Sequence, residues 1–160
     1  MSMTVTAQIA KQLRDVHFGG NWTASNLKQH LSEVTWQQAT TKIPSFNTIV
    51  ALVYHMNYYV GAIIKVLQGG PLDAHDKYSF DHPPISSQQD WQNLLDKTCA
   101  DAETLAALIE QVPDARLGED FLDGKYGTWY RNLAGLIEHT HYHLGQIVLI
   151  KKMLVKTAAG

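Results

Sequence analysis

The segment HTHYHLGQ, residues 139–146, places three histidines within five positions of an otherwise largely apolar stretch. Imidazole nitrogens bind divalent metals, move protons near neutral pH, or form hydrogen bonds in a protein core. On a helix, residues four apart project from the same face, so His139 and His143 can hold one object between them. His141, two residues from each, points in another direction. The spacing leaves a metal site, a proton relay and a hydrogen-bonded pair as alternatives.

A third histidine occupies the same kind of position in another apolar stretch, residues 46–68. In both stretches, steps of three and four residues trace an apolar stripe that histidine interrupts, at His55 in one and at His139 and His143 in the other. Burying imidazoles without partners costs about 2 kcal/mol or more each, so a polar group must lie opposite them. At a rise of about 1.5 Å per residue, antiparallel helices bring the three histidines to similar heights. We therefore expect them to converge on one core.

Three neutral imidazoles leave at least one coordination position of a divalent ion open, as is typical of catalytic rather than structural sites. Zn(II), Ni(II) and Fe(II) all accept such ligands, and the sequence does not rank them. The alternative is a core histidine cluster hydrogen-bonded to Tyr58, Tyr59 or Asn57. Three histidines on two facing stripes favour the metal site over this alternative.

Two other metal motifs lack the residues that they require. A zincin protease needs glutamate directly after the first histidine of HExxH, but Thr140 follows His139. A di-iron carboxylate bundle needs glutamates from several helices, yet residues 46–68 contain neither Asp nor Glu. The sequence therefore argues against protease and di-iron chemistry.

Four further residues are candidates for the surroundings of the site. Gln146 lies one turn after the last histidine and could hydrogen-bond a ligand or a bound solvent molecule. Tyr58 and Tyr59 follow the first histidine by three and four positions, so one of them can face a cavity. Asn132, two turns before the second histidine, is a possible pocket wall.

No acid or base stands out beside the histidines, so the catalytic residues stay unassigned. Glu138 should face away from the stripe. Residues 71–84 are rich in Pro, Asp and His and lack periodicity, which is typical of a long connection. We interpret the acidic and histidine side chains of this segment as a solvated turn rather than a second metal site.

Helical periodicity dominates the chain and predicts the elements that must position the histidines. Helices are expected over 4–17, over a short segment 24–33 capped by Thr23 or Ser25, over 45–68, from a cap at Ser86 to just before Pro113, and over 128–154. No segment has a convincing strand pattern. Four main helices with one long connection, between the second and the third, predict an all-α four-helix bundle of up-down-down-up topology.

Composition bounds the class of protein. A chain of 160 residues fits one domain, 1–160. Its net charge of 13 − 15 = −2 and the absence of a basic run argue against nucleic acid or an anionic membrane surface as a partner. Cys99 is the only cysteine, which excludes an internal disulfide and fits a reducing compartment. The amino end lacks a signal-peptide pattern and no later stretch is uninterruptedly apolar over about 20 residues, so we expect a soluble, cytoplasmic protein.

A histidine in YHMNYY followed far downstream by HxxxHxGQ resembles the DinB/YfiT-like superfamily of metalloenzymes. The resemblance covers nearly the whole chain, including the FGGNWT stretch. It implies an up-down-down-up four-helix bundle in which His55, His139 and His143 bind a divalent metal. Many relatives carry two adjacent histidines before xGQ, whereas Tyr142 precedes His143 here, which leaves the role of His141 open.

The resemblance also implies a class of chemistry. Characterised branches of the superfamily include transferases and isomerases that depend on low-molecular-weight thiols, and homodimers are common. A bound cation deprotonates a thiol into the competent nucleophile. We therefore expect a metal-dependent transferase or hydrolase that acts on a small molecule, with a low-molecular-weight thiol as a possible cosubstrate. The alternative is a non-catalytic, dimeric, stress-associated or binding bundle with a structural histidine cluster.

Overall fold

The chain folds into helices joined by shorter turns and by two long connections, residues 68–87 and 111–128, whereas the sequence pattern predicted only the first. The computed structural model describes residues 3–158, and side-chain exposure through residue 154. Within this range there are six α-helices, two short 3-10 helices and no β-strand, which confirms the prediction of an all-helical protein. The helices are α1 (Val5–Phe18), α2 (Leu27–Leu31), α3 (Trp36–Thr40), α4 (Ile49–Leu67), η1 (Asp76–Tyr78), α5 (Gln88–Glu110), η2 (Asp114–Gly118) and α6 (Trp129–Ala158).

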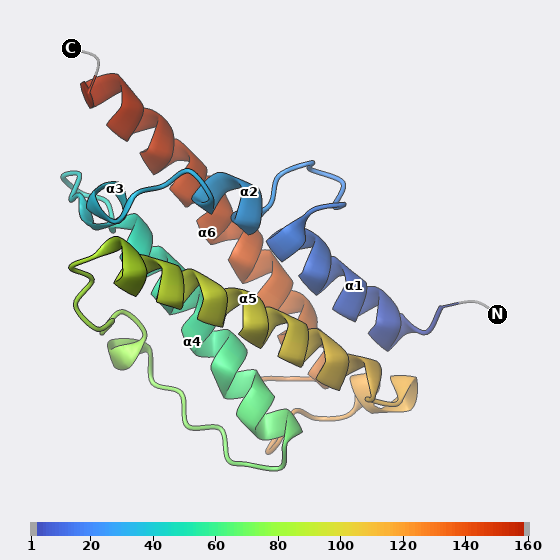
Figure 1. Cartoon of the computed structure of the whole chain (residues 1–160). Coiled ribbons are helices and arrows are strands. Elements are labelled where there is room, and N and C mark those ends of the chain that lie inside the picture. The colour runs from blue at the N-terminus through green and yellow to red at the C-terminus, as the bar shows by residue number, and fades with distance from the viewer. Residues whose placement is uncertain (1–2, 159–160) are drawn as a thin grey trace.

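The long helices α1, α4, α5 and α6 pack together (Figure 1). Helix α1 contacts α5 and α6, and α4 contacts the same two helices. The short α2 packs on α1 and α6, while α3 packs on α4 and α5. In Figure 1 the segment between α4 and α5 runs back along α4 before α5 begins. The two helices that carry the histidines, α4 and α6, are therefore neighbours.

Helix α4 begins four residues later than the apolar pattern suggests. Ser45, the predicted start, has a φ of 68°, which lies in the left-handed region and outside an α-helix. The cap is Thr48, whose side chain accepts a hydrogen bond from the backbone N–H of Ala51 at 3.2 Å. The predicted start at Ser45 was therefore wrong, because a turn residue with a polar side chain imitates a cap in the sequence.

Two other predicted caps are also displaced by a residue or more. Helix α2 is capped by Asn26 rather than by Thr23 or Ser25, since the Asn26 carboxamide accepts from the N–H of the third helical residue at 2.9 Å. Helix α5 begins after Ser87 rather than Ser86. The five-residue helix α3 was not predicted, because a single turn is too short to show a period.

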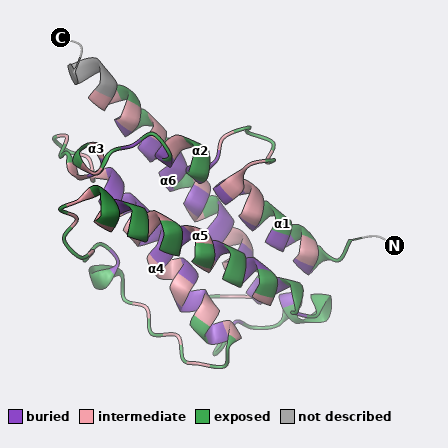
Figure 2. Cartoon of the chain, viewed as in Figure 1, coloured by how far each residue is buried: buried purple, intermediate pink, exposed green. Residues whose placement is uncertain are grey.

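The core lies between the long helices, where buried residues face one another (Figure 2). Leu13, Val53, Leu105 and Ile147, one from each long helix, are 0% exposed. Full burial of such a side chain is worth roughly 1.5–3 kcal/mol. Trp91 is equally buried, and its indole Nε1 donates to the carbonyl oxygen of Val34 at 2.8 Å, which ties the α2–α3 segment to α5.

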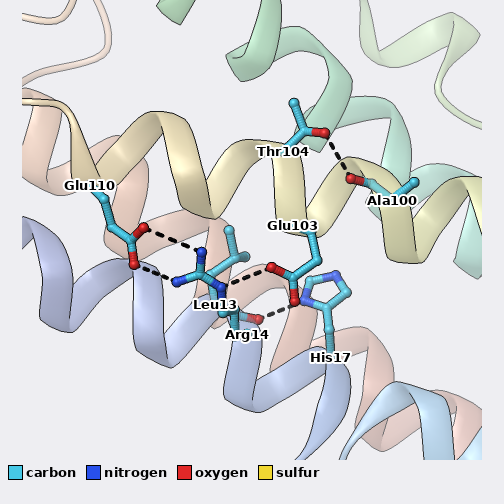
Figure 3. Close-up of polar contacts among 7 residues, drawn as sticks. All are labelled: Leu13, Arg14, His17, Ala100, Glu103, Thr104 and Glu110. Atoms are coloured by element: carbon cyan, nitrogen blue, oxygen red, sulfur yellow. Dashed lines mark hydrogen bonds and ion pairs between the residues drawn. The ribbon is translucent and has the colours of Figure 1, made fainter.

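Arg14 connects α1 to α5 at the surface (Figure 3). Its Nε donates to Glu103 at 2.9 Å, and its two Nη atoms donate to Glu110. Hydrogen bonds to Glu110 and then to Glu103 raise the pKa of the Arg14 guanidinium. Solvent-exposed pairs of this kind contribute only about 0–1 kcal/mol each, so apolar burial is the main force that holds α1 against α5.

Helix α4 is long and apolar enough to cross a membrane by length and composition, the one such helix among the described residues. An 18-residue window of this helix has a mean hydropathy of 1.4, and 72% of the window is buried inside the protein. Burial of this extent is what the central helix of a globular protein requires.

Candidate metal centre

Three histidines from α4 and α6 meet at one point in the interior. Nε2 of His55 lies 3.0 Å from Nε2 of His139, and Nε2 of His143 lies 3.0 Å from the same atom. One nitrogen from each ring lies within 4.8 Å of the others. His55 and His143 are buried, at 6% and 7% exposure, and His139 is partly buried. The structure brings together the three residues that the sequence singles out, and their role as metal ligands stays a prediction.

The tautomer of His55 follows from its partners. Its Nδ1 lies 2.8 Å from the hydroxyl oxygen of Ser79, and that hydroxyl donates its one hydrogen to the carbonyl oxygen of Asp76 at 2.7 Å. With the Ser79 hydrogen on the carbonyl oxygen of Asp76, the Ser79 oxygen accepts and Nδ1 of His55 carries the proton. This leaves a lone pair on Nε2 of His55, directed at the other histidines.

Gln146 fixes His143 in the same way. The amide oxygen of Gln146 lies 2.7 Å from Nδ1 of His143, and a carbonyl oxygen can only accept, so Nδ1 carries the proton. Nε2 of His143 therefore also presents a lone pair. Nδ1 of His139, in contrast, is buried and has no hydrogen-bond partner among the described residues.

Two lone pairs thus point at a single neighbour, Nε2 of His139, which has at most one hydrogen to donate. Hydrogen bonds within the cluster cannot satisfy both acceptors, whereas one cation satisfies all three nitrogens. Nitrogens bound to one Zn(II) at about 2.1 Å lie roughly 3 to 3.5 Å apart, which the separations of 3.0 Å match. The donor set therefore fits a divalent metal ion.

All three rings are held in the neutral form that metal binding requires. Burial, and then the charge of His143, lowers the pKa of His55 to about 4. Burial, and then the charges of His143 and His55, lowers the pKa of His139 to about 4. Burial also lowers the pKa of His143, against an opposing hydrogen bond from Gln146.

The metal-free protein is expected to lose thermal stability as the pH falls from about 6.5 to about 4. Between these values the unfolded histidines take up protons that folded His55 and His139 do not, so acid favours the unfolded state. In the presence of a chelator, the thermal unfolding temperature should fall as the pH falls through this range. The fall should be smaller in the double variant His55→Gln/His139→Gln. The control His141→Gln should keep the full fall, and parallel curves for both variants would contradict the assignment.

The connection between α4 and α5 covers the histidines. Ser79 is 0% exposed, and the ring of Phe80 stacks on His55 with centroids 4.0 Å apart and an interplanar angle of 9°. The hydroxyl of Tyr58 accepts the backbone N–H of His75 at 2.8 Å and so anchors this segment to α4. Asp73, His75, Asp76 and Asp81 are exposed, as the interpretation of these side chains as a solvated turn predicted, while Ser79 and Phe80 of the same segment pack on the histidines.

A cavity of about 610 Å³ opens beside His55 and His139. Of the four neighbouring candidates, Tyr59 and Asn132 line this cavity, whereas Tyr58 and Gln146 do not. Glu138 also lines it, contrary to the expectation that it faces away. The remaining lining residues come from α4, the connection, the segment before α6, and α6 itself: Ala62, Ile63, Leu72, Ala74, Asp76, Phe121, Tyr126, Arg131, Gly135 and Leu136.

An acid beside the histidines, missing from the sequence-based prediction, is supplied by Asp76. Its Oδ1 accepts a hydrogen bond from the phenol of Tyr59 at 2.8 Å. Burial, and then this hydrogen bond, raises the pKa of Tyr59 to about 12, so the phenol keeps its proton. The ring of Tyr59 stands edge-on to His55 and His139, with centroids 5.2 and 5.3 Å apart. A carboxylate and a phenol thus border the cavity next to the metal centre.

His141 lies apart from this cluster. It is partly buried and lines a second, smaller cavity of about 390 Å³ together with residues of α1 and the Gly20–Thr23 turn. The structure therefore gives His141 no contact with the metal centre.

Removing the groups that contact Nδ1 of His55 and of His143 should weaken metal binding without abolishing it. Ser79→Ala and Gln146→Ala each delete the group that fixes a ring tautomer, and such losses typically cost about 10- to 100-fold in affinity. Competition against a chromophoric chelator would measure the change, with Ser32→Ala and Gln92→Ala as exposed controls. Wild-type affinity in both site variants would show that the outer contacts do not orient the ligands.

Comparison with known proteins supports the resemblance seen in the motifs. The family model of the DinB superfamily matches residues 12–147, which includes all three histidines of the centre. No curated protein and no solved structure matches the chain. Because this family model covers most of the chain, it shows the family: the chain belongs to the DinB superfamily.

Proposed function

We propose that the protein is a metal-dependent enzyme in which His55, His139 and His143 hold a divalent ion next to a substrate cavity. One observation supports this proposal most. Nε2 of His55 and Nε2 of His143 each direct a lone pair at Nε2 of His139, which has at most one hydrogen and so cannot donate to both. When bound there, the ion would supply a Lewis acid that favours the deprotonated form of a thiol or a water molecule.

The reaction class that fits best is transfer to or from a low-molecular-weight thiol, with hydrolysis as the neighbouring case. Cys99 does not line the cavity, and burial raises the pKa of its thiol, so it is held protonated. A reacting thiol would therefore come from a cosubstrate that enters the cavity. This origin accounts for a site that has space beside the histidines rather than a fourth protein ligand.

In this proposal Asp76 accepts the proton released by the thiol or water. Its carboxylate lines the cavity and is oriented by the phenol of Tyr59. Tyr59 donates rather than ionises, since its pKa is raised to about 12. Ser79 links the backbone of Asp76 to His55, so the same turn orients a ligand and positions the acceptor.

The test is a two-stage screen of the metal-loaded protein. Metal loading with Zn(II), Ni(II) and Fe(II) is followed by addition of thiols such as glutathione or cysteine with electrophiles such as a chloronitrobenzene or an epoxide, and separately of ester and amide substrates. Turnover that needs both metal and thiol supports a transferase, and turnover without thiol supports a hydrolase. Full metal occupancy with no turnover across the panel favours the binding bundle.

We also propose the finer features that accompany this family. The long connection that returns along α4 supports an up-down-down-up order of α1, α4, α5 and α6. Residues 1–160 would form a single domain that assembles as a homodimer in the cytoplasm and binds neither nucleic acid nor membranes. Light scattering after size exclusion would test the dimer.

A further inference from the structure

We propose that the cavity takes a small organic carboxylate, with Arg131 binding the carboxylate at one end and the histidine centre facing the reactive group at the other. Only the contact between the reactive group and the histidine centre rests on the proposed function. The carboxylate subsite itself depends on residues of α6 that are not metal ligands.

Arg131 is a cation that the protein holds in place but does not neutralise. It lines the cavity, and its Nη1 donates to the carbonyl oxygen of Tyr126 at 2.9 Å. Its stem packs closely against Gly127, where a Cβ would lie 3.0 Å from Cδ of Arg131. Among the described residues no carboxylate forms an ion pair or hydrogen bond with Arg131. Four of its five N–H donors therefore remain for a ligand, and a guanidinium matches a carboxylate with two parallel hydrogen bonds.

Arg131 and His139 line the same cavity from α6. Arg131, Gly135 and His139 follow one another at intervals of four residues, and each step turns about 40° around the helix, so the row winds from exposed Arg131 to partly buried His139. The rise from Arg131 to His139 is about 12 Å along the axis, at about 1.5 Å per residue. A small molecule can therefore touch the guanidinium and the metal centre at once.

Gly135 keeps the space between these two ends open. It lines the cavity in the middle of α6, and a Cβ added there would meet nothing within 4 Å. Glycine inside a helix is about 1 kcal/mol less favourable than alanine. Gly135 therefore destabilises α6 although no neighbouring atom excludes a side chain there. A large side chain at 135 would project into the groove between Arg131 and His139.

The distribution of charge gives the ligand a direction. Asp76 lies at the end of the cavity near His55, where it accepts from Tyr59. Glu138 is an exposed lining residue next to His139 in the sequence. In the metal-free protein both acids disfavour a carboxylate at the histidine end, and the guanidinium attracts it to the other end. This asymmetry selects a ligand with a single carboxylate distant from its reactive group.

The first arm of the test needs no metal. Hexanoate and 1-hexanol are each titrated into metal-free protein and followed by NMR. In the wild type the Nε–H resonance of Arg131 reports binding, and in the variants the Kd is taken from backbone resonances of α6. We expect saturable binding of hexanoate, tighter than that of hexanol by about 10-fold or more, because only the acid forms charge-assisted hydrogen bonds. Arg131→Gln should remove the preference, and Gly135→Leu should remove binding.

Two matched variants serve as controls. Lys65→Gln removes one exposed positive charge outside the cavity, and Gly145→Leu adds the same side chain to another open position of α6. Both should bind hexanoate like the wild type. Equal binding of hexanoate and hexanol, an absence of saturable binding, or an equal loss in Arg131→Gln and Lys65→Gln would overturn the subsite.

The second arm separates this inference from the proposed function. Cobalt-loaded protein is titrated with 6-mercaptohexanoate and 6-mercaptohexanol, and thiolate binding is read from visible absorption. Tighter binding of the acid, lost in Arg131→Gln, supports both proposals. Equal binding of the two thiols overturns the subsite alone. Failure of the protein to bind cobalt, with the hexanoate preference intact, overturns the metal site and leaves the subsite standing.

Discussion

Replacing His55, His139 or His143 singly with alanine is expected to weaken the binding of one divalent ion by more than about 100-fold, beyond the usual cost of losing an outer partner. In the proposed site each residue would supply one of the three ligands found among the described residues, so its loss would leave two nitrogens to hold the ion. The loss should be similar at all three positions, because their Nε2 atoms surround one point.

Titration calorimetry with Zn(II) and Ni(II) on chelator-treated, untagged protein measures this effect. His141→Ala is the matched control, since it removes an imidazole from the same segment without touching the cluster. Circular dichroism of each variant confirms that the helices persist. Unchanged affinity in any of the three variants, or a loss in His141→Ala as large as theirs, would place the ion elsewhere.

The second large effect is expected at Asp76. Its replacement by asparagine removes the proposed proton acceptor while keeping the size of the side chain and a hydrogen-bond acceptor for Tyr59. General-base catalysis is typically worth about 10²- to 10⁴-fold, so any turnover by the metal-loaded protein should fall by that order. Metal affinity should change little, because the contact of Ser79 is with the backbone oxygen of Asp76.

Steady-state rates with the substrate pair from the screen, together with metal affinity, check this prediction. Asp81→Asn provides the control, as Asp81 is an exposed carboxylate of the same connection that does not line the cavity. If Asp76→Asn retains the wild-type rate with the metal bound, the proton is accepted by another group, and Glu138 at the cavity edge is the next candidate.

The meeting of the histidines could be read from the sequence because helical periodicity determines which side chains share a face. His139 and His143 are four apart, and His55 interrupts an apolar stripe that has to face the core. Gln146 followed by the same logic, one turn from His143. Residues on regular helices have directions that their spacing encodes.

In segments without helical periodicity, the spacing of residues does not predict the direction of their side chains. Ser79 and Asp76 lie in the connection between α4 and α5, where only the folded path brings Ser79 to His55 and Asp76 to Tyr59. Their composition resembles that of any solvated turn. The same limit applied to Ser45, whose left-handed backbone moved the start of α4 to the residue after Thr48.

Arg131 was not predicted, and Glu138 was expected to face away from the site, for a different reason. They lie at the edge of the helix stripe, where a long side chain reaches either the cavity or solvent, and the periodicity of α6 does not decide between the two. The segment before α6 decides it for Arg131, since the carbonyl of Tyr126 binds its guanidinium.

Anomalous X-ray diffraction from crystals of the metal-loaded protein, recorded on both sides of the metal's absorption edge, would locate the bound ion. We expect one strong peak per chain, within about 2.0–2.3 Å of Nε2 of His55, His139 and His143. A fully loaded crystal with its peak at another position, or with no peak among these three nitrogens, would contradict the proposed metal site.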